Sequence, residues 1–129
     1  CVNDSKATSF EACLQSLLIY DKIYWILGGL PKKNDLFNLK NISKKIIKAY
    51  VIGKNTKFFV KQIQKKISYK ISGNLKNAIK NIYNDIKKRK NLRSVILLSP
   101  AAASFDQFNN FESRGNYFKN LAIKKFKNN

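Results

Sequence analysis

The sequence predicts an α/β domain of Rossmann-like type, in which a mostly parallel sheet is flanked by helices to give three layers. First, short apolar runs alternate with longer amphipathic segments about five times along the chain, an order typical of βα units with right-handed crossovers. Second, runs such as residues 23–27 (IYWIL) are apolar throughout, as in strands buried on both faces. Third, 44% of the 129 residues are hydrophobic, which is enough for one core.

The first half of the chain contains three predicted strands and two predicted helices. The strands cover residues 1–3, 23–27 and 49–52, and the helices cover residues 8–20 and, more weakly, 41–48. Thr8 and Glu11 fit a capping box at the start of the first helix. The apolar face of this helix carries Phe10, Leu14, Leu17 and Leu18, with Cys13 as a buried thiol on the same side.

The second half continues the alternation to the end of the chain, without an internal linker. The predicted helices cover residues 56–65, 74–88 and 111–126, and the predicted strands cover residues 67–71 and 95–98. Alternation of apolar and polar residues in 67–71 indicates a strand nearer the sheet edge. The helix over 74–88 has the strongest apolar stripe, at Leu75, Ala78, Ile79, Ile82 and Ile86.

The net charge is +19, which by itself suggests a nucleic acid or an anionic membrane surface as a partner. However, lysine outnumbers arginine 23 to 3, and lysine, asparagine and isoleucine share A/T-rich codons. Arginine is the usual residue for bidentate contacts with phosphates and bases. We therefore attribute the charge to mutational bias and predict neither a nucleic-acid nor a membrane partner. A basic nucleic-acid-binding α/β domain is the alternative.

Composition also excludes several kinds of site. The chain has no histidine, so it contains no Ser-His-Asp or Cys-His nucleophile system. No group of Cys and acidic residues has metal-ligand spacing, and seven acidic residues disfavour a paired-carboxylate site. Cys1 and Cys13 form no CxxC motif, and we expect a reducing cytoplasm. The lack of methionine indicates a segment of a longer reading frame, in preference to a processed lipoprotein beginning at Cys1.

Four unusual segments follow predicted strands, at the sheet edge where parallel α/β folds bind ligands. They are NDSKAT (3–8), GGLPKK (28–33), Gly53 and SPAAASFDQF (99–108), the last within a stretch, 94–118, whose only cation is Arg114. Lys6 beside a helix N-terminus, Lys32 after a glycine turn and Ser104 are candidates for binding a phosphate or carboxylate. Each has a structural alternative: Thr8 merely caps the helix, the lysines are solvated, and the last segment is a packed turn.

These motifs resemble the C-terminal domain of the Mur ligases, and among them the members that add D-glutamate. The matching stretches are NDSKAT at 3–8, LGG with Lys32 at 27–32, LLSPAAASFDQF at 97–108 and NFESRGNYF at 110–118. Residues 41–93 match in layout only. The resemblance implies that residues 1–129 form the amino-acid-binding domain, which closes over a central domain that carries the ATP phosphate loop and the Mg²⁺ ligands.

The resemblance also implies a reaction and its participants. D-glutamate would be added to UDP-N-acetylmuramoyl-L-alanine in peptidoglycan synthesis, through an acyl phosphate, with ATP and Mg²⁺ as cofactors. The full-length enzyme would be a cytoplasmic monomer, and this domain by itself would be inactive. Another amino-acid-adding Mur ligase and a stand-alone regulatory or structural domain are further alternatives.

Individual roles follow from motif position. The resemblance places Asp4 and Lys6 near the nucleotide and the reacting phosphate. It places five residues around D-glutamate, namely Thr8, Lys32, Ser104, Phe105 and Phe111. Three positions depart from the family pattern: Ser9 replaces a common asparagine, Ala102 replaces a frequent cysteine, and Leu30-Pro31 replace Asp-Gly, which leaves Lys33 as the alternative to Lys32.

Overall fold

The central feature is a parallel sheet of five strands in the order β1-β6-β2-β4-β5. The computed structural model describes residues 1–89, 93–104 and 108–127. The strands are β1 (Val2–Asn3), β2 (Ile23–Gly28), β4 (Ile46–Ile52), β5 (Tyr69–Gly73) and β6 (Val95–Leu98). Every neighbouring pair in this sheet is parallel, which confirms the predicted fold class.

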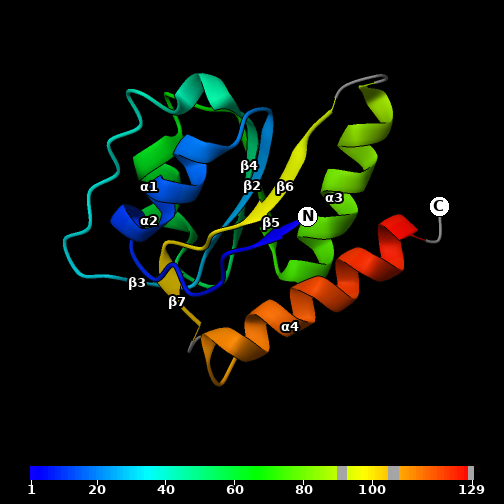
Figure 1. Ribbon diagram of the computed structural model, residues 1–129. Helices are drawn as coiled ribbons and strands as arrows, with labels where there is room; N and C mark the ends of the chain where they lie inside the picture. Colours follow the sequence, from blue (N-terminus) through cyan, green and yellow to red (C-terminus); the bar gives the residue numbers. More distant parts are fainter. Residues whose placement is uncertain (90–92, 105–107, 128–129) are drawn as a thin grey trace.

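Helices cover both faces of the sheet and complete three layers. Figure 1 shows α1 and α2 on one side and α3 and α4 on the other. Their bounds are α1 (Phe10–Ile19), α2 (Thr56–Ile63), α3 (Leu75–Lys88) and α4 (Phe111–Ala122), the last continued by the π-helical turn η2 (Ile123–Lys127). A short antiparallel pair, β3 (Leu30–Pro31) with β7 (Ala102–Ala103), lies beyond the main sheet and was not predicted.

Strand β2 shows why the apolar runs are continuous. All six of its residues are buried, because side chains that alternate along a strand here enter two different cores. Trp25 and Leu27 pack in the cluster that includes residues of α1 and α2, whereas Tyr24 and Ile26 pack in the cluster that includes residues of α3 and α4. In contrast, β5 lies at the sheet edge, as its alternating sequence predicted, but it begins at Tyr69 rather than at residue 67 and leaves Ile71 54% exposed.

The predicted cap and apolar face of the first helix were partly wrong. Helix α1 begins at Phe10, and Ser9 is its N-cap, with Oγ accepting the Ala12 N–H at 3.3 Å. Ser9 stands where the family commonly has asparagine. Serine and asparagine are comparable N-cap residues, so the replacement keeps a side chain that caps the helix. The buried positions of α1 are Phe10, Cys13 and Leu17, while Leu18 is 47% exposed. Successive buried positions three and four residues apart define that narrower face.

The weak helix predicted over residues 41–48 was also wrong. Only one 3₁₀ turn, η1 (Ser43–Lys45), forms there, and strand β4 already begins at Ile46. Ile46 pairs with Ile23 of β2, and its side chain is buried against the sheet. The β-branched pair Ile46-Ile47 therefore extends the strand rather than a helix.

A polar cluster at the border of the core between β4 and α3 joins these two elements. The Tyr50 hydroxyl donates to Asp85 Oδ2 at 2.6 Å, and Lys48 Nζ donates to the same oxygen at 3.2 Å. Burial raises the pKa of Tyr50, which keeps this phenol protonated as the donor. For Asp85, burial acts to raise the pKa, but the hydrogen bonds from Tyr50 and Lys48 outweigh it and hold the pKa below its ordinary value of 3.8.

Replacing Asp85 by asparagine should reduce stability in a pH-dependent way. A carboxylate whose pKa is depressed in the folded state stabilises the protein above its ordinary pKa, and this contribution is lost as the pH falls through the folded value. We therefore expect Asp85→Asn to be less stable than wild type at about pH 7, with the gap closing toward about pH 3. Urea unfolding at both pH values measures this, with the exposed Asp21→Asn as control. An equal gap at both pH values would contradict it.

Candidate functional site

Loops that follow four strands meet at the carboxyl edge of the sheet, as the topology predicted. The segment after β2 pairs with the segment after β6 through Leu30 and Ala103, and the Gly28 N–H donates to the Pro100 carbonyl at 2.9 Å. Asn55, in the segment after β4, donates from Nδ2 to the Gly29 carbonyl at 2.9 Å. Lysine-poor and glycine-rich segments that are distant in the sequence are therefore part of one surface.

Gly28 and Gly29 allow this close approach of backbones. Both have φ above +130°, at 131° and 134°, a conformation that residues with a Cβ rarely adopt. A Cβ at Gly28 would collide with the Ile52 carbonyl, and one at Gly29 would collide with the Ala103 carbonyl. The predicted glycine turn is thus required by the contact between the segments after β2, β4 and β6.

Asp4 lies at the start of the segment after β1 and is turned toward the interior. Its carboxylate oxygen Oδ2 accepts hydrogen bonds from Ser16 Oγ and Ser99 Oγ, both at 2.8 Å, and the residue is 8% exposed. The Ser99 carbonyl in turn accepts from Trp25 Nε1 at 2.7 Å and from Cys13 Sγ at 3.1 Å. Asp4 therefore fixes its loop to α1 and to the end of β6.

Cys13 is a structural thiol, as its place on the apolar face predicted. Burial raises its pKa to about 12, and its side chain is fully enclosed. A thiol with such a pKa stays protonated at neutral pH, and the thiolate is the nucleophilic form. Its contribution is the hydrogen bond that it donates to the Ser99 carbonyl.

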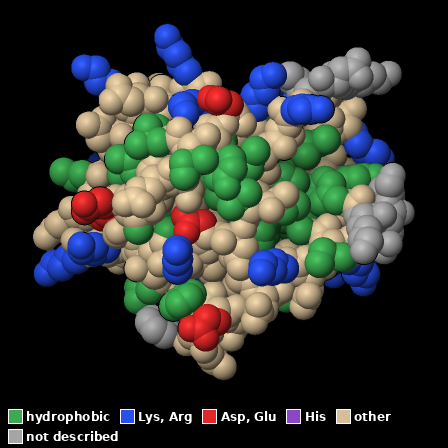
Figure 2. Space-filling view, viewed as in Figure 1, with side chains coloured by type: hydrophobic (Ala, Val, Ile, Leu, Met, Phe, Trp, Pro, Cys, Tyr) green, Lys and Arg blue, Asp and Glu red, His purple; other side chains and the backbone are tan. Residues whose placement is uncertain are grey.

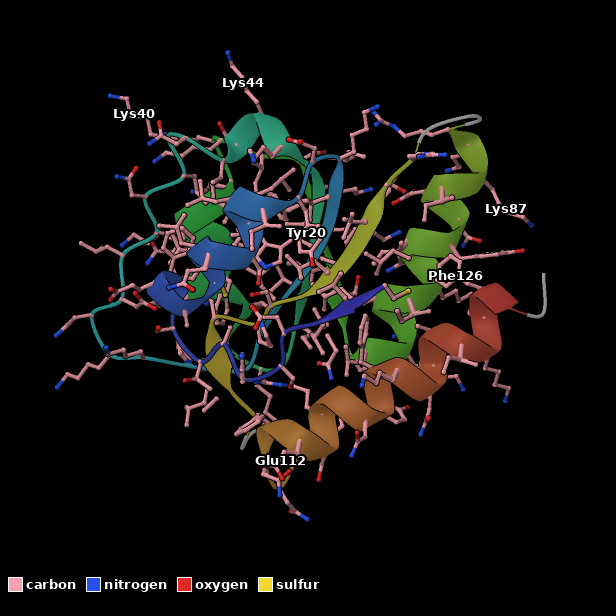
Figure 3. All side chains as sticks on the ribbon, in the orientation of Figure 1. Tyr20, Lys40, Lys44, Lys87, Glu112 and Phe126 are labelled. Atoms are coloured by element: carbon pink, nitrogen blue, oxygen red, sulfur yellow. The ribbon has the colours of Figure 1, made fainter. Side chains whose placement is uncertain are left out.

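Lys6 and Phe111, two of the predicted site residues, line the same small pocket. Its volume is about 200 Å³, and it is lined by Asn3, Ser5, Lys6, Phe111, Glu112 and Asn116. Ser5 Oγ donates to the Phe111 carbonyl at 2.7 Å, which holds the two sides of the pocket together. Lys6 itself is exposed, and Figure 3 shows Glu112 on the first turn of α4. The pocket offers an ammonium group, a carboxylate and a 40% exposed aromatic ring.

The remaining predicted residues are placed less closely together. Thr8 and Lys32 are exposed, and Ser104 is 2% exposed. The register of β3 with β7 places Lys32 and Ser104 beyond opposite ends of that short ladder. Phe105 lies outside the described residues. The structure thus brings Lys6 and Phe111 together, and it leaves the grouping of Thr8, Lys32 and Ser104 around one ligand as a prediction.

The N-terminus of α1 is less open to a ligand than its sequence indicated. Asp35 Oδ2 accepts the Phe10 N–H at 2.8 Å, and Ser9 Oγ accepts the Ala12 N–H. The protein therefore supplies its own carboxylate at a place where helix N–H groups and the helix dipole favour an anion. Asp35 was not singled out in the sequence, since an aspartate in a polar turn carries no distinctive signal.

Arg114 is the second residue that sequence reasoning missed, and it connects the segments after β1 and β6. It is 1% exposed, although it carries a guanidinium group. Its Nε donates to Ser5 Oγ at 2.9 Å and its Nη2 to the Ser5 carbonyl at 2.6 Å, while Nη1 donates to the Ala102 carbonyl at 2.9 Å. A signal did exist: an arginine is unusual among 26 basic residues of which 23 are lysine.

Basic side chains do not gather in one place on the face shown in Figure 2. Lys and Arg are spread across it, with apolar side chains exposed between them. Among the described residues, no three His, Cys, Asp or Glu side chains are grouped so that they could hold a metal ion. Within the same ranges, no helix has the length and apolarity to cross a membrane.

Comparison of the sequence with known proteins shows which family the chain resembles. No family model matches the chain. Over 117 residues the chain is 44% identical to the UDP-N-acetylmuramoylalanine–D-glutamate ligase of Rhizobium meliloti (strain 1021), a match that covers 91% of this chain and 25% of that protein. The chain matches a Mur ligase C-terminal domain.

Other relatives give the same result. The ligase of the same name from Mesorhizobium japonicum is 44% identical over 121 residues, and that from Nitrobacter winogradskyi is 42% identical over 120 residues. The chain spans about a quarter of the length of these relatives, at 26% of each. The match therefore confirms the resemblance found in the motifs.

The structure explains how the chain accommodates Ala102 and Leu30-Pro31, the positions that depart from the family pattern. Ala102 contributes its backbone carbonyl to Arg114, so that hydrogen bond does not depend on a cysteine side chain. Leu30 and Pro31 form β3, whose pairing with β7 joins two of the converging segments. Both departures therefore keep the backbone contacts at the carboxyl edge.

Replacing Arg114 by lysine should destabilise the domain strongly. One ammonium group cannot reach three acceptors that a planar guanidinium binds together, so buried acceptors lose their donors. We expect a loss of about 3 kcal/mol in the free energy of unfolding, measured with urea. Arg93→Lys, at an exposed position, is the matched control. A loss below about 1 kcal/mol for Arg114→Lys would show that the guanidinium is not the connecting group.

Proposed function

We propose that this chain, over residues 1–129, is the amino-acid-binding, closing domain of an ATP-dependent ligase of peptidoglycan biosynthesis. The full-length enzyme would add D-glutamate to UDP-N-acetylmuramoyl-L-alanine. The observation that carries the proposal is 44% identity, over 91% of the chain, to proteins named for that ligation. Convergence of the segments after β1, β2, β4 and β6 at one edge supports it, because parallel α/β sheets bind ligands at that edge.

The proposed chemistry is divided between this domain and the rest of the polypeptide. ATP, bound with Mg²⁺, would transfer a phosphoryl group to the substrate carboxylate and leave as ADP. The amine of D-glutamate would then attack the acyl phosphate, forming the amide and releasing phosphate and a proton. The nucleotide phosphates and the metal would be held by the central domain. The described part of this chain offers no group of acidic side chains for a metal, so we assign no metal-dependent step to it.

The residues of this domain would bind and orient the amino acid. D-glutamate carries two carboxylates, and ammonium and hydroxyl groups are suitable donors to them. Lys32 would pair with one carboxylate and Thr8 would donate to the other; both side chains are exposed and therefore available. Ser104, the backbone at Phe105 and the Phe111 ring would complete the pocket.

Lys6 would act on the nucleotide side of the site, and Asp4, whose carboxylate is turned inward, would hold the loop that carries Lys6 there. The loop between them is held by the hydrogen bonds of Asp4 to Ser16 and Ser99, and by those of Arg114 to Ser5. Lys6 is exposed and lines a pocket with Phe111, so its ammonium group can approach a phosphate. Closure of this domain over the central domain would exclude water from the acyl phosphate. We propose a cytoplasmic, monomeric enzyme.

The substrate specificity of the complete reading frame tests the proposal. Phosphate release is measured with UDP-N-acetylmuramoyl-L-alanine, ATP and Mg²⁺, adding D-glutamate, L-glutamate or diaminopimelate in turn. We expect release with D-glutamate only, and none from residues 1–129 alone, since the other domains are required. Release driven by another amino acid would change the substrate within the family. No release from a folded protein would favour the nucleic-acid alternative, which predicts binding that weakens steeply with salt.

Adjacent lysines provide a matched test of the carboxylate contact. We expect Lys32→Ala to raise the KM for D-glutamate at least about tenfold, because a charge-assisted hydrogen bond is lost, while Lys33→Ala stays near wild type. Both side chains are exposed, so neither change should affect folding. Steady-state phosphate release measures the two KM values. The reverse result would assign the role to Lys33, and equal KM values for both variants and wild type would remove this turn from the pocket.

A further inference from the structure

The segment that carries Lys32 is irregular but firmly held. After the two residues of β3 it contains no further strand or helix until η1 at Ser43. Its middle is fixed by Phe37, which is 5% exposed and stacks on Phe10 of α1 with ring centroids 4.6 Å apart. Its near end is fixed by β3 pairing with β7 and by Asn55 at Gly29. Lys32 lies between these two anchors.

Asp35 connects the Lys32 turn to two helices. Its N–H donates to the Lys32 carbonyl at 3.1 Å, which closes a tight turn in which Asn34 has a φ of 63°. Its carboxylate accepts the Phe10 N–H at 2.8 Å, at the first residue of α1. Its carbonyl accepts from Gln62 Nε2 of α2 at 2.8 Å. The same Gln62 side chain accepts the Phe37 N–H at 3.2 Å through Oε1.

These contacts connect the backbone at Lys32 to the backbone close to Thr8 through Asp35. Thr8 lies two residues before Phe10, whose N–H is bound by Asp35, and Lys32 lies three residues before Asp35 in the turn that Asp35 closes. The carboxylate of Asp35 also suits its position, because the N-terminus of a helix favours negative charge. A lysine side chain is flexible, so the place of its backbone decides whether its ammonium group meets a carboxylate in the required geometry.

We propose that Asp35 is a positioning residue for the amino-acid pocket. By binding the first N–H of α1 while closing the Lys32 turn, it sets the distance between Lys32 and Thr8 and so matches them to the two carboxylates of one amino acid. This inference rests on the proposed function of the site. Asp35 does not touch the ligand; it acts through the backbone of residues 32–35.

The test uses the complete enzyme with three substitutions at Asp35 and one control. Asp35→Ala removes the contact with α1, and we expect it to raise the KM for D-glutamate about tenfold while the KM for ATP stays unchanged. Asp35→Asn keeps an oxygen acceptor for the Phe10 N–H and should restore most of the affinity. Asp21→Ala, which removes a carboxylate whose side chain is 76% exposed, should change neither KM.

Asp35→Glu keeps the charge but adds one methylene, so the turn must shift to preserve the contact with Phe10. We expect a KM for D-glutamate between those of wild type and Asp35→Ala, and this variant decides the question if the alanine variant does not fold. An unchanged KM for D-glutamate in folded Asp35→Ala or Asp35→Glu overturns the proposal. So does an equal rise in both KM values that Asp35→Asn fails to restore, because that pattern indicates only general loss of structure.

The same KM measurements separate the positioning role of Asp35 from the proposed function of the enzyme. If Lys32→Ala raises the KM for D-glutamate and the folded Asp35 variants do not, Lys32 binds the amino acid without help from Asp35. If wild type shows no release that depends on D-glutamate, the proposed function itself fails and the positioning role fails with it.

Discussion

The carboxyl edge of the sheet depends on the buried guanidinium of Arg114. Burying a cation costs free energy unless its N–H groups donate hydrogen bonds. Here the Arg114 guanidinium donates to Ser5 Oγ, the Ser5 carbonyl and the Ala102 carbonyl. The loop after β1 and the loop after β6 therefore cannot separate without leaving these buried groups unpaired. Helix α4, which carries Arg114, is attached to both loops by the same side chain.

A second set of hydrogen bonds supports the same loops from inside. Asp4 binds Ser16 of α1 and Ser99 at the end of β6, and the Ser99 carbonyl accepts from Trp25 in the middle strand. Polar groups that point inward thus fix the backbone, whereas Lys6, Thr8 and Lys32 point outward from it. This division is what an anion-binding surface requires, since flexible charged side chains bind with useful geometry only on a fixed frame.

Part of the candidate site could be predicted from the sequence and part could not. The motifs correctly indicated that NDSKAT, the glycine turn and SPAAAS meet at one edge, because the order of parallel strands determines which loops share an edge. They also indicated Lys6 for the phosphate and Phe111 for the amino acid, and the structure places both residues in the lining of one pocket. Asp35 and Arg114 were missed because their roles lie in contacts with backbone groups of distant segments. Only the rarity of arginine in this lysine-rich chain pointed to Arg114.

The sequence by itself determined the order of the five strands of the main sheet and of the four helices that cover it, and the two-sided burial of β2, because apolar periodicity depends only on neighbouring residues. It failed at residues 41–48, where pairing of Ile46 with Ile23 overrode a weak helical pattern. Only the tertiary structure decided which polar groups turn inward. Arg114 and Ser5 are 109 residues apart in the sequence, and a hydrogen bond between them exists only once β1, β6 and α4 are assembled.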